Sequence, residues 1–78
     1  MTQLTATEPR FAICIANTEY PAALEVRKIY QVLPDADAAQ HHYLRIIDES
    51  GEDYLYPAAY FVPIDLPPPI QEALLHAA

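Results

Sequence analysis

The sequence predicts a mainly β protein, a small five-stranded barrel with a short C-terminal helix. Three observations lead to this prediction. Short segments rich in β-branched and aromatic residues recur along the chain with turn residues between them. The one glycine, Gly51, lies between two such segments, where a tight hairpin turn is expected. A proline corner at residues 57–59 then separates the last two segments, and this succession is typical of small barrels.

The first half of the chain is expected to supply two strands. Residues 1–9 are polar and rich in threonine, which predicts a flexible N-terminal arm. Residues 10–17 alternate bulky and small side chains, which predicts the first strand. Residues 24–34 predict the second strand, with room for a bulge. A helix also fits the spacing there, but the β-branched and aromatic content favours a strand. The expected apolar face of this strand consists of Leu24, Val26, Tyr30 and Val32.

The second half is expected to complete a barrel domain at 10–66, followed by a helical segment at 67–78. Proline suits the first turn of a helix, and apolar residues then follow at helical spacing. Pro63 predicts an edge position for its strand, because proline cannot donate to the ladder. The elements between are an acidic loop at 35–40, strands at 41–48 and 53–56, the hairpin turn at 49–52, and a fifth strand at 60–64.

Two stretches carry a resemblance to a known family. LEVRKIYQVLPD and HHYLRIIDESGEDYLYPAAYFVPI look like the second strand, the hairpin and the closing corner of the SH3 domain. Pro57 and Tyr60 match the Pro-x-x-Tyr of that family's motif, with Leu55 and Phe61 at core positions. The resemblance implies an SH3-like barrel.

The same comparison shows departures from the SH3 pattern. His42 and Tyr43 stand where the family usually has tryptophans, and NTEYPAA replaces its long acidic loop. Recognition of proline-rich peptides in the family's usual way is therefore not implied. The whole sequence, particularly DESGEDYLYPA, is also similar to a family of small bacterial proteins without an assigned activity.

Composition narrows the classes of function. Eleven acidic residues against four basic ones give the 78-residue chain a net charge of −7. This balance argues against nucleic acid and anionic membranes, which attract basic surfaces, and it favours a basic partner. No apolar run is long enough to span a membrane, and the N-terminus does not read as a signal peptide, so a cytoplasmic location is expected. Cys14 is expected to be a small buried apolar residue.

Two groups of polar residues are candidates for a chemical role. Carboxylates and imidazoles could supply metal ligands near the acidic loop, but their spacing matches no strong metal template and consecutive histidines on a strand diverge. These residues are Asp35, Asp37, His41 and His42. A second acidic group flanks the hairpin turn, where its members are expected to be exposed and to orient a basic partner. It consists of Asp48, Glu49, Glu52 and Asp53.

The function expected from the sequence is a non-catalytic protein-interaction module without metal or cofactor. Tyrosine combines apolar area with a polar tip, which suits interfaces. Since Leu55 is expected in the core, Tyr54 and Tyr56 are expected to face outward. The expected contacts for a protein or peptide partner are His42, Tyr54, Tyr56, Pro57 and Tyr60. The alternative is a small metal- or ligand-binding protein that uses the Asp35, Asp37, His41 and His42 region. The sequence says nothing about the oligomeric state.

Overall fold

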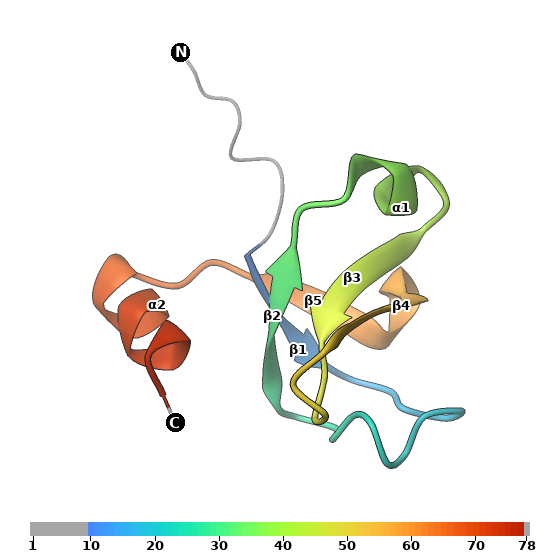
Figure 1. The fold of residues 1–78 in the computed structure, drawn as a ribbon, viewed down its shortest axis with the longest axis horizontal. Helices are drawn as coiled ribbons and strands as arrows, with labels where there is room; N and C mark the ends of the chain where they lie inside the picture. The colour runs from blue at the N-terminus through green and yellow to red at the C-terminus, as the bar shows by residue number, and fades with distance from the viewer. Residues whose placement is uncertain (1–9, 78) are drawn as a thin grey trace.

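The computed structural model describes residues 10–77, which form five strands and two short α-helices (Figure 1). The mainly β class and the C-terminal helix are thereby confirmed, whereas the predicted flexible arm at 1–9 lies outside the described residues. The elements are β1 (Phe11–Cys14), β2 (Ile29–Leu33), α1 (Ala36–Gln40), β3 (Tyr43–Ile47), β4 (Asp53–Pro57), the 3₁₀ helix η2 (Ala58–Tyr60), β5 (Phe61–Ile64) and α2 (Pro68–Leu75).

The strands form one antiparallel sheet in the order β4-β3-β2-β1-β5. Strands β4 and β5 are its two edges, and η2 connects them directly. Within residues 10–77 no ladder pairs β4 with β5, so the sheet is not closed into the predicted barrel. The edge position predicted from Pro63 is confirmed, because β1 is the one strand of the described residues that pairs with β5.

The core lies against one face of this curved sheet, and small residues on β1 make room for aromatic rings. Ala12 and Cys14 are fully buried, which confirms the prediction for Cys14. Ala12 lies opposite Tyr30, whose ring meets Phe61 edge-on with centroids 6.3 Å apart. Such edge-to-face pairs add to the stabilisation from buried area. The main cluster of buried core residues consists of Ala12, Cys14, Leu24, Tyr30, Val32, Ile46, Tyr56 and Phe61.

The predicted second strand begins later than expected, at Ile29 rather than at Leu24. The preceding residues form a turn and then a bulge. Arg27 has a φ of 77° and donates its N–H to the Cys14 carbonyl, while the Cys14 N–H donates to the Lys28 carbonyl. Arg27 and Lys28 on one strand therefore oppose the single residue Cys14 on the other, as in a β-bulge. This bulge turns the chain, so that Leu24 is buried while Val26 is exposed and does not join the predicted apolar face.

The predicted acidic loop at 35–40 is instead the short helix α1. The Asp35 side chain accepts a hydrogen bond from the Ala38 N–H at 2.9 Å and caps the helix. A capping aspartate followed by three alanines stabilises a helical turn, because alanine has the highest helix propensity. The helix ends at Gln40 with His41 as its C-cap, and His42 takes a φ of 65°. Strand β3 consequently starts at Tyr43 and not at 41.

The β3–β4 hairpin confirms the predicted turn but reverses the predicted faces of β4. Gly51 has a φ of 84°, as expected for the turn. Leu55 is 44% exposed and lies opposite Arg45, whereas Tyr56 is only 4% exposed and lies opposite Leu44. The predictions that Leu55 is a core residue and that Tyr56 faces outward are therefore wrong. The predicted 3₁₀ corner after β4 and the core position of Phe61 are confirmed.

The C-terminal helix α2 is confirmed, but it stands beside the sheet and does not cap it (Figure 1). Pro68 lies in its first turn, as the sequence predicts. None of its residues is buried, and Ile70 and Leu74 are exposed. Its first turn is held by Gln71, which accepts a hydrogen bond from the Arg10 guanidinium at 3.1 Å and donates to the Leu66 carbonyl at 2.7 Å.

Replacing the turn glycine should destabilise the fold. At a φ of 84° an added Cβ meets no atom within 4 Å, so the cost comes from the backbone conformation alone. We expect Gly51→Ala to lower the free energy of unfolding by about 1–2 kcal/mol, measured by urea denaturation. Gly51→Asn is the matched variant, since asparagine tolerates this conformation, and its loss should be clearly smaller. Equal stability of Gly51→Ala and the unsubstituted protein would contradict this account.

Candidate functional site

Three of the five predicted contact residues come together at one end of the β3–β4 ladder. The Ala58 N–H donates to the His42 carbonyl at 2.9 Å, which fixes η2 against the start of β3. Pro57 lies opposite Tyr43 in the ladder, and Tyr60 ends η2. His42, Pro57 and Tyr60 are therefore neighbours through the backbone, although they belong to the start of β3, the end of β4 and η2.

Two further aromatic residues lie at this end of the ladder, and neither is among the contacts predicted from the sequence. Tyr43 directly follows His42 and is 42% exposed. Tyr20, from the loop between β1 and β2, has its ring centroid 6.2 Å from that of Tyr60. Tyr43 stands where SH3 domains usually have a tryptophan, and that resemblance could have indicated it, whereas no local signal connects Tyr20 with Tyr60. We call the group of Tyr20, His42, Tyr43, Pro57 and Tyr60 the aromatic end.

The other two predicted contacts lie elsewhere. Tyr56 is a core residue whose ring packs edge-on against Tyr20, with centroids 4.9 Å apart. Tyr54 lies opposite Ile46, toward the hairpin turn, and is 52% exposed. Its hydroxyl donates to the Glu52 carboxylate at 3.3 Å. The structure therefore separates Tyr54 from the aromatic end and removes Tyr56 from the surface.

Asp48 was expected to be exposed, but it is 6% exposed, so that expectation is wrong. Its carboxylate accepts hydrogen bonds from the Ser50 N–H at 2.9 Å, the Ser50 hydroxyl at 2.6 Å and the Tyr56 hydroxyl at 2.5 Å. Burial by itself raises the pKa of Asp48, but these donors outweigh burial and hold the pKa below its ordinary value. Asp48 is therefore an ionised anchor for a core tyrosine.

Glu49 performs the same task for the second core tyrosine. Its carboxylate accepts hydrogen bonds from Lys28 at 2.6 Å and from the Tyr30 hydroxyl, and both lower the pKa of Glu49. Burial raises the pKa of the Tyr30 and Tyr56 hydroxyls, and their carboxylate partners raise it further. Both hydroxyls therefore stay protonated and donate. The backbone N–H of Glu49 also donates to the Ala23 carbonyl at 3.0 Å.

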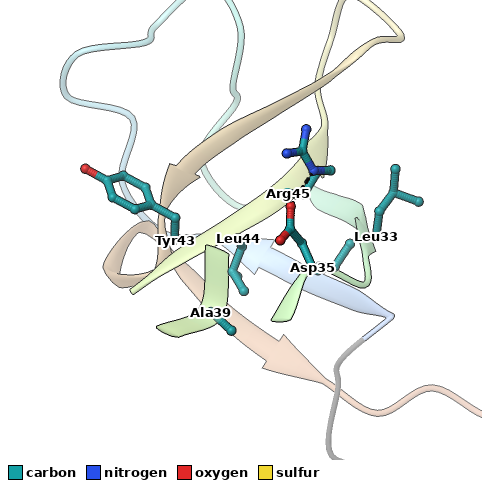
Figure 2. A pocket seen from close by; sticks show the side chains of 7 residues that line it. Leu33, Asp35, Ala39, Tyr43, Leu44 and Arg45 are labelled. Carbon is teal, nitrogen blue, oxygen red and sulfur yellow. Dashed lines mark hydrogen bonds and ion pairs between the residues drawn. The ribbon is translucent and has the colours of Figure 1, made fainter. Parts of the chain in front are cut away.

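A small cavity lies between β2, α1 and β3, and Figure 2 shows its lining side chains. The Arg45 guanidinium lies beside it and forms ion pairs with Asp35 at 2.8 Å and with Asp53 at 2.9 Å. The cavity volume is about 30 Å³, whereas small-molecule sites typically measure about 300–1,000 Å³. It therefore has room for about one water molecule and not for an organic ligand.

The residues considered as metal ligands do not converge. Among residues 10–77, no three His, Cys, Asp or Glu side chains form a group that could hold a metal ion. The Asp35 carboxylate caps α1 and pairs with Arg45, while the His41 Nδ1 lies 2.9 Å from the Asp37 carbonyl oxygen. No observation here favours the alternative function.

In comparisons with family models, curated proteins and solved structures, none matches this chain. Among residues 10–77, no helix combines the length and apolar character needed to cross a membrane. A functional proposal therefore rests on the arrangement of this protein's own residues.

Removing the hydroxyl of Tyr56 should leave the buried Asp48 carboxylate short of one donor. We expect Tyr56→Phe to lower the free energy of unfolding by about 1–3 kcal/mol in urea denaturation, the usual cost of an unsatisfied buried polar group. Tyr54→Phe is the matched control, because it removes an exposed hydroxyl from the same strand and should cost little. Similar stabilities of the two variants would show that the Tyr56–Asp48 hydrogen bond does not stabilise the fold.

The lowered pKa of Asp48 predicts how stability changes in acid. A carboxyl whose pKa is lower in the folded state stabilises the protein above its unfolded pKa of about 3.9, and this contribution is lost as pH falls through the folded value. Asp48→Asn should therefore lower stability at neutral pH and lose less stability on acidification than the unsubstituted protein. Glu19→Gln controls for the change in net charge. Parallel curves of unfolding free energy against pH for Asp48→Asn and the unsubstituted protein would contradict the assignment.

Proposed function

We propose that this protein is a non-catalytic interaction module that binds a protein or peptide partner through the aromatic end. The observation that carries the proposal is the gathering of His42, Pro57 and Tyr60 from separate elements. Tyr43 is the cross-strand partner of Pro57, and the Tyr20 ring contacts that of Tyr60. Aromatic residues of this kind are enriched in protein interfaces because they offer large apolar area with a polar tip.

Part of the aromatic end is held in place before a partner binds, which supports a binding role. The hydrogen bond from Ala58 to His42 fixes the 3₁₀ corner. The Tyr20 ring is packed against the rings of both Tyr56 and Tyr60. A surface whose side chains are already ordered pays less conformational entropy on association.

Charge supports a partner with basic character. The chain carries a net charge of −7, so its field attracts cations and opposes nucleic acid. Complementary charge mainly raises the association rate, while the aromatic contacts supply affinity. A single buried cysteine, Cys14, suits the reducing cytoplasm that we propose as the location. The resemblance to SH3 domains belongs to this proposal, supported by Pro57 and Tyr60 at the 3₁₀ corner.

The proposal predicts that exposed aromatic area at this end determines affinity. The test uses a peptide selected on the protein from a displayed random library. We expect Tyr43→Thr to weaken its binding by about tenfold or more in calorimetry, which corresponds to about 1.4 kcal/mol. Threonine keeps a residue suited to a strand at this exposed position, so the fold should persist.

Val62→Thr is the matched control, because Val62 is similarly exposed but lies on β5. It should leave the affinity unchanged. Amide shifts induced by the peptide should centre on His42, Tyr43 and Ala58. Equal affinities for folded Tyr43→Thr and the unsubstituted protein, or failure to select any binding peptide, would overturn the proposal.

A further inference from the structure

Strand β4 has an unpaired edge, and the hairpin's hydrogen bonds show which of its backbone groups are free. The Ala58 N–H donates to the His42 carbonyl at 2.9 Å, and the Asp48 N–H donates to the Glu52 carbonyl at 3.0 Å. Both pairs obey the register of the β3–β4 ladder. In an antiparallel ladder every second pair exchanges hydrogen bonds, so the pairs of Tyr54 and Tyr56 with β3 do so as well.

The residues between these pairs direct their backbone groups away from β3. Asp53 and Leu55 therefore present two N–H donors and two carbonyl acceptors along the outer edge. β3 is the only strand paired with β4, and no other backbone hydrogen bond among residues 10–77 involves Asp53 or Leu55. Pro57, the next outward position, has no N–H and ends the edge.

The opposite edge of the sheet is closed to the same kind of pairing. On β5, the hydrogen bond from the Ile15 N–H to the Tyr60 carbonyl at 2.7 Å sets the alternation, so Phe61 and Pro63 point outward. The Phe61 N–H already donates to the Ala58 carbonyl, and Pro63 has none. The outer edge of β5 therefore offers no free backbone N–H group, whereas the outer edge of β4 offers two. An edge strand that is not blocked in this way is a template for another chain.

The side chains beside the β4 edge decide what kind of chain fits it. Tyr54 and Leu55 are exposed large apolar residues on opposite faces of the strand. Glu52 and Asp53 are exposed carboxylates at its start, and Arg45, the one basic residue of β3 and β4, is already shared between two carboxylates. The local charge is therefore negative, which opposes a second copy of this acidic chain and attracts a cationic segment.

We propose that the free edge of β4 pairs with an extended segment of a partner protein that alternates lysine or arginine with apolar residues. The segment runs antiparallel to β4 and exchanges backbone hydrogen bonds with Asp53 and Leu55. Its basic side chains all lie on one face, where they meet either Asp53 or Glu52. Its apolar side chains lie on the other face, where they cover Tyr54 in the first case and Leu55 in the second. This strand-addition site is distinct from the aromatic end and does not depend on it.

In the test, the full chain is titrated with a short peptide of alternating lysine and valine, and NMR records the backbone amide shifts of the protein. We expect saturable shifts at Asp53 and Leu55 and slower hydrogen exchange of their N–H groups. N-methylation along one edge of the peptide leaves its other edge free and should preserve binding. N-methylation along both edges should weaken binding by about tenfold or more, as should replacement of lysine by glutamate.

Three results would overturn the proposal. Shifts confined to His42, Ala58 and Tyr60 would place the peptide at the aromatic end, supporting the proposed function but not this edge. Binding unaffected by full N-methylation would exclude backbone pairing. Concentration-dependent broadening of Asp53 and Leu55 without peptide, with dimers in sedimentation, would assign the edge to a second copy. Because the variants are in the peptide, none of these results depends on whether a mutant protein folds.

Discussion

The fold depends on the hydrogen bonds that satisfy the hydroxyls of its two core tyrosines. Tyr30 and Tyr56 fill space that a short chain cannot leave empty, but a buried hydroxyl without a partner is costly. Consecutive carboxylates at the end of β3 supply both partners, Asp48 for Tyr56 and Glu49 for Tyr30. Glu49 also binds the loop before β2 through the carbonyl of Ala23. One dipeptide therefore connects the hairpin turn, the aromatic core and the long β1–β2 loop.

Elements defined by local chemistry were predictable from the sequence. Gly51 fixes the hairpin because the turn requires a positive φ, and Pro57 introduces the corner between β4 and β5. Pro63 identifies an edge strand and Pro68 begins α2. In each case the conformational limits of a single residue determine the outcome, so no knowledge of distant contacts is needed.

Features that depend on distant contacts were not predictable. The alternation in β4 is compatible with either Leu55 or Tyr56 in the core, and hydrophobicity alone favours leucine. Tyr56 is the buried one because Asp48, eight positions earlier, accepts its hydroxyl. The bulge before β2 similarly arises from contacts with Cys14. For the same reason the residues predicted to contact a partner do not all lie together. His42, Pro57 and Tyr60 meet, whereas Tyr54 lies apart. Tyr20, a neighbour only in the folded structure, was not predicted.

The size of the domain confines the partner binding that we propose to its outer surface. A chain this short buries a smaller share of its surface than a large domain does, and the core side chains fill its small interior. The cavity beside Arg45 is about 30 Å³, far below the volume of a ligand pocket. What remains for binding is exposed aromatic area and unpaired backbone. Prolines limit the unpaired backbone: Pro63 lacks an N–H on the outer edge of β5, and Pro57 ends the free edge of β4. Asp53 and Leu55 are left for the partner strand that we propose.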